Sequence, residues 1–246
     1  MHVVIIPLLK CKSNVNNNRP IAIVTILSKV LEQVLLSRLS RYLWTADSQF
    51  GFKRAHGTEI AIFAINQTIN FYCNQDTPVY MCFLAANKAF DRVNHWTLWK
   101  KLLDRNVPLH IVKLFIFWYR EQEYMVRWGN SLSMTFLCAN GIREGGQLSP
   151  LLYNVYTDDL KHHLQATGVR CYVGGAWANS LSYADDMVLL APTVTALQTL
   201  LEVCRSYAGP TQRKQYVCWS GQNNHRVGSQ SGSEMRKFTL SISFVT

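Results

Sequence analysis

The sequence lacks the features by which membrane and secreted proteins are recognised. No apolar run approaches the roughly 20 residues of a membrane-spanning helix. The apolar stretch from Val3 to Leu9 contains Pro7, has no basic segment ahead of it and meets Lys10 too early for a signal peptide, so a buried strand fits it better. The seven cysteines are odd in number, scattered and never two residues apart, which supports neither a disulfide framework nor a zinc knuckle. We therefore expect no membrane contact and a reducing compartment, nuclear or cytoplasmic.

The motifs of several enzyme classes are missing too. No serine lies in a nucleophile elbow or a P-loop, and the histidines, His162 and His163 included, lack metalloprotease spacing, so we expect them to be surface or packing residues. Acidic residues are scarce, 15 against 25 basic ones, for a net charge of +10. Residues 151–208 hold three basic and five acidic side chains, a net −2, so the rest carries +12. Such a distribution suits a protein whose peripheral lysines and arginines hold a polyanion while its central carboxylates hold a metal. Charge that serves only solubility would explain the net charge equally well.

The most informative feature present is the tetrapeptide Tyr183 to Asp186, which lies between Leu181 and the apolar run Met187 to Ala191. Two adjacent carboxylates within a regular strand would point to opposite faces, whereas at a tight turn both can project forward. Crowded like charges are costly unless a cation compensates, and carboxylate oxygens suit Mg²⁺ or Mn²⁺. The pattern therefore predicts a metal site on a hairpin, with a solvated turn as the alternative.

A second, similar tetrapeptide, Tyr156 to Asp159, has a different setting. Ser149 and Pro150 are typical of a helix start, and apolar residues then recur at helical spacing. We therefore predict that Asp158 and Asp159 form a solvent-facing helix edge.

Periodicity and turn residues predict an alternation of helices and strands. The run from Val79 to Leu84 is apolar throughout, which is typical of a strand buried on both faces. Few apolar residues occur between Pro210 and Lys237, so residues 209–246 are predicted to be a polar, disordered tail. Helices are predicted over 28–43, 58–72, 96–105, 108–119 and 193–207 and from Ser149, strands over 3–9, 79–84 and 169–173, and hairpins over 124–138 and 181–191.

Several segments, in the same order, resemble the reverse transcriptase domain of non-LTR (LINE-type) retrotransposons across residues 3–208. They are Arg19-Pro20-Ile21 with Lys29 and Glu32, residues 49–53 with His56-Gly57-Thr58, Phe83-Leu84 with residues 88–93, residues 141–154, and residues 183–186. The resemblance implies an α+β right-hand polymerase with fingers and palm and an antiparallel palm sheet with helices packed on one face, and we expect the thumb to be absent from this chain. Residues 1–78 would be fingers-like and residues 79–208 palm-like, with 121–145 returning to the fingers.

The resemblance also implies an RNA-directed DNA polymerase and a role for each matched residue. Asp185 and Asp186 would be the catalytic metal ligands, with Mg²⁺ as the ion and Mn²⁺ as a substitute, in a two-metal nucleotidyl transfer. An RNA template, a DNA primer and deoxynucleotide triphosphates would be the partners. The residues expected at the nucleotide are Phe90, Tyr183, Ala184, Gly145, Gly146 and Arg19, and those expected at the nucleic acid are Lys29 and Lys53.

Some of these residues have simpler interpretations as well. Phe90 matches the family position where an aromatic ring blocks a sugar 2′-hydroxyl, and without the resemblance it would be a core residue. Gly145 and Gly146 would let the backbone approach the nucleotide because they lack a Cβ, or they belong to a plain loop. A basic residue beside a helix, such as Lys29, is commonly just solvated.

The chain departs from the family pattern at Ala85, where the family has its first metal-binding aspartate. Asp91 is no easy replacement, because six helical residues carry it ~9 Å along the axis whereas Mg–O contacts span about 2.1 Å. Glu144 and Gln147 replace a glutamine and an apolar residue, and the family's strand after Tyr207 is hard to find. We therefore expect severe loss of polymerase activity. The alternatives are a non-catalytic remnant that binds RNA or an RNA/DNA hybrid, and a relic copy without a role.

Overall fold

A computed structural model describes residues 2–9, 18–53, 55–86, 88–208, 214–221 and 236–237. The chain forms two compact units, each built from separate stretches. The first unit comprises Met1–Thr45 and Lys88–Thr157, and the second comprises Ala46–Asn87 and Asp158–Thr246. These units do not follow the predicted division at residue 78. Among the described helices, none combines the length and apolar character that crossing a membrane requires.

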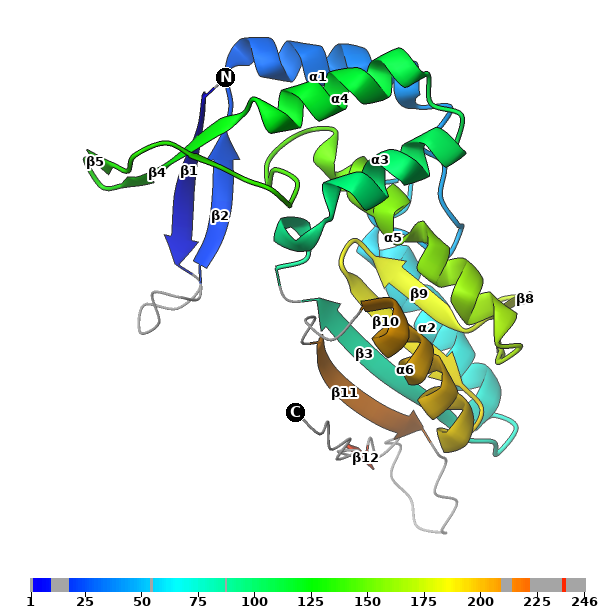
Figure 1. Ribbon diagram of the computed structural model, residues 1–246. Helices are drawn as coiled ribbons and strands as arrows, with labels where there is room; N and C mark the ends of the chain where they lie inside the picture. Colours follow the sequence, from blue (N-terminus) through cyan, green and yellow to red (C-terminus); the bar gives the residue numbers. More distant parts are fainter. Residues whose placement is uncertain are drawn as a thin grey trace. The chain divides into compact units, whose positions relative to one another are not determined.

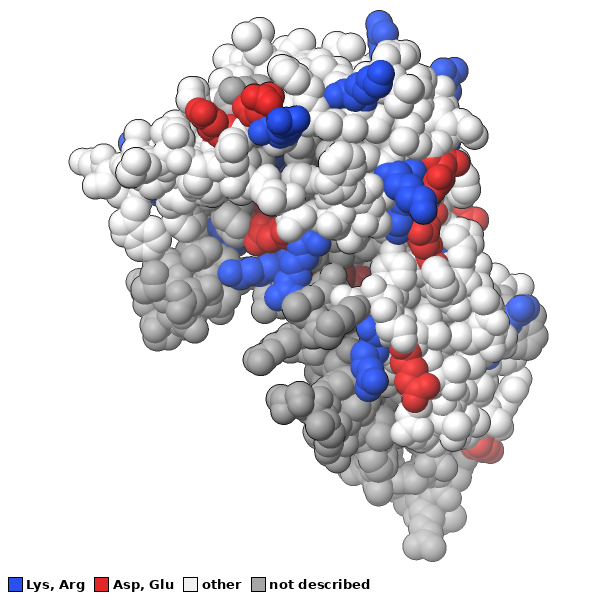
Figure 2. Space-filling model, viewed as in Figure 1, with Lys and Arg blue, Asp and Glu red and all other residues white. Residues whose placement is uncertain are grey.

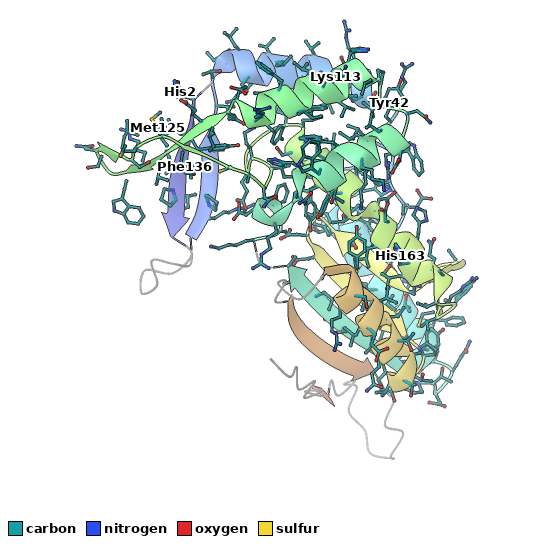
Figure 3. All side chains as sticks on the ribbon, in the orientation of Figure 1. His2, Tyr42, Lys113, Met125, Phe136 and His163 are labelled. Atoms are coloured by element: carbon teal, nitrogen blue, oxygen red, sulfur yellow. The ribbon has the colours of Figure 1, made fainter. Side chains whose placement is uncertain are left out.

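The first unit contains a five-stranded sheet. Strand β1 (His2–Leu9) pairs antiparallel with β2 (Asn18–Ile23) and parallel with β4 (Glu123–Trp128). The short strands β5 (Ser131–Leu132) and β6 (Phe136–Leu137) fold back antiparallel onto β4 (Figure 1). The turn before β5 contains Gly129 at φ +60°, and the Tyr124 ring stacks on Phe136, which is labelled in Figure 3. The strand predicted at 3–9 and the predicted hairpin are both confirmed.

The core of the first unit is helical. Helix α1 (Ile26–Leu39) starts at Thr25, whose side chain accepts the Ser28 N–H, and α3 (His95–Asp104) starts at Asn94, which accepts the Thr97 N–H. Such caps satisfy N–H groups that lack a partner within the helix. Helix α4 (Leu109–Arg120), the 3₁₀ turn η1 (Phe90–Arg92) and the first part of α5 (Ser149–Ala166) complete the unit. Their apolar faces form one buried cluster that includes the stacked rings of Trp99 and Phe115.

The second unit is built on an antiparallel sheet with the strand order β12-β11-β3-β10-β9. The strands are β3 (Val79–Ala86), β9 (Ser180–Tyr183), β10 (Asp186–Ala191), β11 (Lys214–Gly221) and β12 (Arg236–Lys237). A separate hairpin joins β7 (Cys171–Val173) to β8 (Ala176–Ala178) through Gly174 and Gly175, both at positive φ. The mixture of helices and an antiparallel sheet confirms the predicted α+β class.

Helices cover both faces of this sheet, rather than the one face that we expected (Figure 1). On one face, Cys82 and Leu84 pack with α5 and α6 (Val194–Ala208). On the other face, Val79 and Met81 pack with α2 (Thr58–Cys73) and β7. Because β3 carries apolar side chains in both directions, each face needs a covering layer.

Part of the predicted disordered tail is a strand. Residues 214–221 form β11, which pairs antiparallel with β3 along its whole length, so the prediction is wrong for these residues. Two causes favour this strand. The run Tyr216 to Trp219 is rich in residues with high β-propensity, and the backbone N–H and C=O groups at the edge of β3 need hydrogen-bond partners. Apart from Arg236–Lys237, the rest of the predicted tail lies outside the described residues.

Candidate active site

The two adjacent carboxylates lie at the tip of a tight hairpin, as the sequence predicted. Tyr183 pairs with Asp186, and Ala184 and Asp185 form the two-residue turn between β9 and β10. Ala184 has φ +57° whereas Asp185 is not in the left-handed region, which is the pattern of a type II′ turn. Tyr183 and Asp186 are exposed and Asp185 is half-buried, so both carboxylates are accessible from the tip.

The carboxylates repel each other. Partial burial, together with the neighbouring Asp185 charge, raises the pKa of Asp186 above its usual range. A divalent cation would relieve this repulsion, and two carboxylates are the kind of donor that Mg²⁺ accepts. Within the described part of the chain, however, no group of three or more His, Cys, Asp or Glu side chains comes together to hold a metal. The donors therefore fit the ion in type but form an incomplete set.

The pairing of β3 with β10 decides which side chain adjoins these carboxylates. Ala85 stands directly opposite Asp186, and on its other side it is paired with Gln215 of β11. Directly opposed residues of an antiparallel pair share one face, with Cβ atoms roughly 4.5–5.5 Å apart. The prediction that residue 85 adjoins the acidic corner is confirmed. The side chain opposite Asp186 is therefore a methyl group, which cannot ligate a metal.

In the first unit, the loop before α5 is tied to β2. The Glu144 carbonyl accepts the Ala22 N–H at 2.9 Å, and the Glu144 carboxylate accepts Arg19 Nε at 2.8 Å. Gly145 has φ +105°, and a Cβ there would lie 3.2 Å from the Ala22 carbonyl oxygen. A Cβ on Gly146 would lie 2.7 Å from Ser149 Oγ. Close packing within the fold therefore explains why both residues are glycine, and their contact with a nucleotide stays a prediction.

Residues 10–211 match the family model described as reverse transcriptase (RNA-dependent DNA polymerase). The chain belongs to this family. One relative, the Retrovirus-related Pol polyprotein from type-2 retrotransposable element R2DM of Drosophila melanogaster, is 28% identical over 184 residues, 75% of this chain and 17% of the relative. The RNA-directed DNA polymerase from mobile element jockey of Drosophila funebris is 28% identical over 208 residues, 79% of this chain and 22% of the relative. This reverse transcriptase chain therefore spans about a fifth of the length of these relatives.

Solved structures share the fold. Telomerase from Candida tropicalis, in complex with a fragment of telomeric RNA, aligns with a TM-score of 0.55 at 12% identity, covering 89% of this chain and 38% of that one. The corresponding Candida albicans structure gives a TM-score of 0.51 at 11% identity, covering 82% and 40%. The non-LTR resemblance and the fingers-and-palm α+β fold of this reverse transcriptase are thus confirmed.

Three other matched residues of the reverse transcriptase lie in settings that explain them structurally. Phe90 is 9% exposed and stacks on Tyr153, with ring centroids 4.9 Å apart. Lys53 is half-buried and its Nζ donates to the Ala46 carbonyl at 2.7 Å, and burial lowers its pKa. Lys29 is exposed on α1. The proposed contacts of these residues with sugar, template or primer stay predictions.

Charges of both signs lie close together on the face of the reverse transcriptase that Figure 2 shows. The blue side chains form small groups, several with a red one beside them, and wide white areas separate them. Basic side chains thus form small local groups in this view rather than one broad basic field.

The second tetrapeptide is not the solvent-facing helix edge that we predicted. The Asp158 side chain is 2% exposed and accepts the Ala46 N–H at 2.9 Å, and Asp159 is half-buried. The prediction failed because a buried carboxylate with a backbone donor has the same sequence signature as a solvated one. His163, labelled in Figure 3, is exposed on α5 and lies against Tyr207, so the expectation for this histidine is confirmed.

Lys161, one turn along α5 from Asp158, was not recognised from the sequence. It is fully buried, and its Nζ donates to Ser182 Oγ on β9, next to the hairpin tip. Burial lowers the pKa of Lys161 to about 7, although the nearby Cys204 and Asp158 favour its charged form. A lysine spaced among the leucines of an apolar helix face was the only signal of this burial.

Stability is therefore expected to rise with pH between about 7 and 10.5, the folded and unfolded pKa values of Lys161. In this pH range the unfolded chain binds one more proton than the folded chain, so the free energy of unfolding rises by about 1.4 kcal/mol per pH unit. Below this pH range the folded chain bears the full free-energy cost of burying the charged Lys161 side chain. Lys161→Met should remove this slope, and urea unfolding at pH 7, 8 and 9 measures it. The exposed Lys113→Met is the control, and parallel curves for the parent and Lys161→Met would contradict the assignment.

A buried ion pair fixes the loop of the first unit that carries Glu144. Arg143 lies 2.6 Å from the Glu32 carboxylate, both side chains are almost fully buried, and the guanidinium carbon lies 4.5 Å from the Trp118 ring centroid. Glu32 also accepts the backbone N–H groups of Gln147 and Leu148. Glu32 belonged to the family resemblance, but its partner was missed because the two residues are 111 positions apart.

Proposed function

We propose that this chain is the reverse transcriptase domain of a retrotransposon protein, that it works by two-metal nucleotidyl transfer, and that its turnover is severely impaired. The supporting observation is the register that sets Ala85 opposite Asp186. The hairpin retains its two carboxylates, and the neighbouring strand supplies a methyl group in place of the third.

In this proposal, Asp185 and Asp186 would hold Mg²⁺, or Mn²⁺ as a substitute. A metal bound there would neutralise charge on the reacting phosphates and orient the primer hydroxyl. The exposed Tyr183 ring, beside the carboxylates, would contact the primer end or the nucleotide sugar. The turn keeps the two carboxylates accessible, and both faces of the sheet beneath them are packed.

The proposed partners are an RNA template, a DNA primer and deoxynucleotide triphosphates. The family membership supports an RNA template, and the Candida tropicalis telomerase that shares the fold is itself in complex with RNA. In the first unit, Arg19 at the start of β2 is exposed over 63% of its side chain and would meet nucleotide phosphates. Phe90 would limit the space for a ribose 2′-hydroxyl from its place in η1.

Primer extension on an RNA template tests the proposal. The parent chain should give little product with Mg²⁺ or Mn²⁺, and Asp185→Asn should remove whatever product remains. Rapid extension by the parent would overturn the claimed impairment. Product that survives in Asp185→Asn would overturn the assignment of the hairpin.

A second candidate function is binding of RNA or an RNA/DNA hybrid without catalysis, which the net charge of +10 favours. Phosphate contacts release counterions, so such binding weakens steeply as salt rises. Fluorescence anisotropy with a labelled hybrid at about 50 and 200 mM salt distinguishes it. Salt-dependent binding without extension would favour this function, and absence of binding at low salt would exclude it.

Glu144→Gln is expected to strengthen nucleotide binding, because Glu144 engages the Arg19 guanidinium that we assign to the triphosphate. An exposed ion pair is worth up to about 1 kcal/mol, which corresponds to roughly two- to fivefold in affinity. Burial and the Glu144 charge raise the pKa of Asp91, so the same substitution should lower that pKa. Fluorescent dATP binding and carboxyl NMR measure the two effects.

A double-mutant cycle supplies the control for Glu144. In the Arg19→Ala background, Glu144→Gln should no longer change dATP affinity if Glu144 acts by occupying Arg19. An unchanged gain in that background would show direct repulsion between Glu144 and the phosphates, and would contradict competition for Arg19.

A further inference from the structure

The turn that carries the carboxylates is held by a buried glutamine from a distant part of the second unit. Gln49 is 3% exposed, and its Oε1 accepts the Ala184 N–H at 3.1 Å and the Gly51 N–H at 2.9 Å. Its Nε2 donates to the Ala184 carbonyl at 3.2 Å. One side-chain amide thus binds both backbone polar groups of the first turn residue, 135 positions away.

The backbone around Gln49 is built against the same hairpin. Phe50 N–H donates to the Ser182 carbonyl at 2.7 Å, and Ser182 N–H donates to the Ser48 carbonyl at 2.8 Å, so residues 48–50 run as a short parallel bridge beside β9. A Cβ built on Gly51 would overlap the backbone nitrogen of Ala184. The segment therefore approaches the tip so closely that only glycine fits there.

The turn needs this support. Ala184 has φ +57°, a conformation that costs free energy for any residue with a Cβ and persists only where surrounding contacts fix it. Turn peptides at a hairpin tip commonly bond to water, which leaves their orientation free to vary. Here the Ala184 peptide groups bond instead to a buried amide, so the direction in which the chain leaves toward Asp185 is fixed.

We propose that Gln49 is a positioning residue for the metal site: it holds the Ala184 peptide groups so that Asp185 and Asp186 face one ion. Gln49 acts through the backbone and does not touch the substrate. Glutamine suits the role because its amide both accepts and donates, whereas an ionised glutamate side chain at this position could not donate to the Ala184 carbonyl. The inference rests on the proposed function of the hairpin as a metal site.

The experiment measures Mn²⁺ affinity by electron paramagnetic resonance in the Ala85→Asp background, where a third carboxylate is available. Gln49→Met, which keeps the volume but loses every hydrogen bond, should weaken Mn²⁺ binding about tenfold or more. Gln49→Glu, which keeps the acceptor and loses the donor, should also weaken it. Gln33→Met, an exposed glutamine on α1, should leave it unchanged.

A further variant separates positioning from stability. Ala184→Gly relieves the positive-φ cost, so in the Gln49→Met chain it should restore stability in urea but not Mn²⁺ affinity. Recovery of both would overturn the positioning role, and so would a Gln49→Met chain that binds Mn²⁺ as tightly as the chain that retains the glutamine. Absence of Mn²⁺ binding in the Ala85→Asp chain itself would instead overturn the proposed function of the hairpin, and with it this inference.

Discussion

Ala85→Asp is expected to raise primer-extension turnover by about 10²–10³-fold over the parent chain. The register places the new carboxylate opposite Asp186, on the same face of the sheet, where it completes a three-carboxylate set. Electrostatic contacts that act on charge in the transition state are typically worth roughly 3–4 kcal/mol, which gives this range. Single-turnover extension of a DNA primer on an RNA template, with Mg²⁺, measures the change.

The same substitution should make stability depend on metal. Without a cation, the added carboxylate faces Asp186 directly, and Asp186 already has a pKa raised by burial and by Asp185. Like charges opposed across a strand pair are destabilising, so Ala85→Asp should lower the melting temperature in a chelator. Mg²⁺ or Mn²⁺ should recover it by binding the folded state. The parent should show a much smaller shift.

Ala86→Asp is the matched control. It adds the same charge to the same strand one position further, and therefore on the opposite face. It should gain neither turnover nor metal-dependent stability. Equal turnover in the parent and Ala85→Asp chains would show that the absent carboxylate is not what limits activity, and a gain in Ala86→Asp would show that any added charge suffices.

Local patterns were enough to predict much of this fold. Apolar periodicity located the helices, and the two short apolar runs around Asp185 predicted a hairpin, whereas its neighbour carrying Ala85 followed from the family resemblance. These elements depend on the alternation of side chains within a few residues, which a sequence displays directly. The apolar run at Val79 also indicated that both faces of the sheet are covered, although the family resemblance led us to expect helices on one face only.

The features that were missed depend on contacts between distant residues. Gln49 lies in a segment that we recognised, but nothing near it in the sequence indicates that its amide binds Ala184. Asp158 has the signature of a solvated helix residue because its donor, the Ala46 N–H, lies 112 positions away. Strand β11 was hidden by its polar surroundings, since its pairing is supplied by the edge of β3. Long-range hydrogen bonds, unlike periodicity, leave no local pattern.

Arg143→Met is expected to lower the free energy of unfolding by about 3–5 kcal/mol. The substitution leaves the Glu32 carboxylate buried, 1% exposed, without the guanidinium that lies 2.6 Å from it. Removing one partner of a buried ion pair costs this much because the remaining charge has lost both its counterion and its water. The backbone N–H groups of Gln147 and Leu148 still bond to Glu32 but carry no full charge. Urea unfolding followed by tryptophan fluorescence measures the loss.

The paired variant Glu32→Met with Arg143→Met decides whether the loss comes from the isolated charge. Replacing both members of a buried pair by apolar residues is commonly neutral or mildly stabilising, so the double variant should be more stable than Arg143→Met alone. The N–H groups of Gln147 and Leu148 would then lose their acceptor, which keeps the recovery partial. If the double variant is less stable than Arg143→Met, the dominant role of Glu32 is to bind these N–H groups, and the ion pair is secondary.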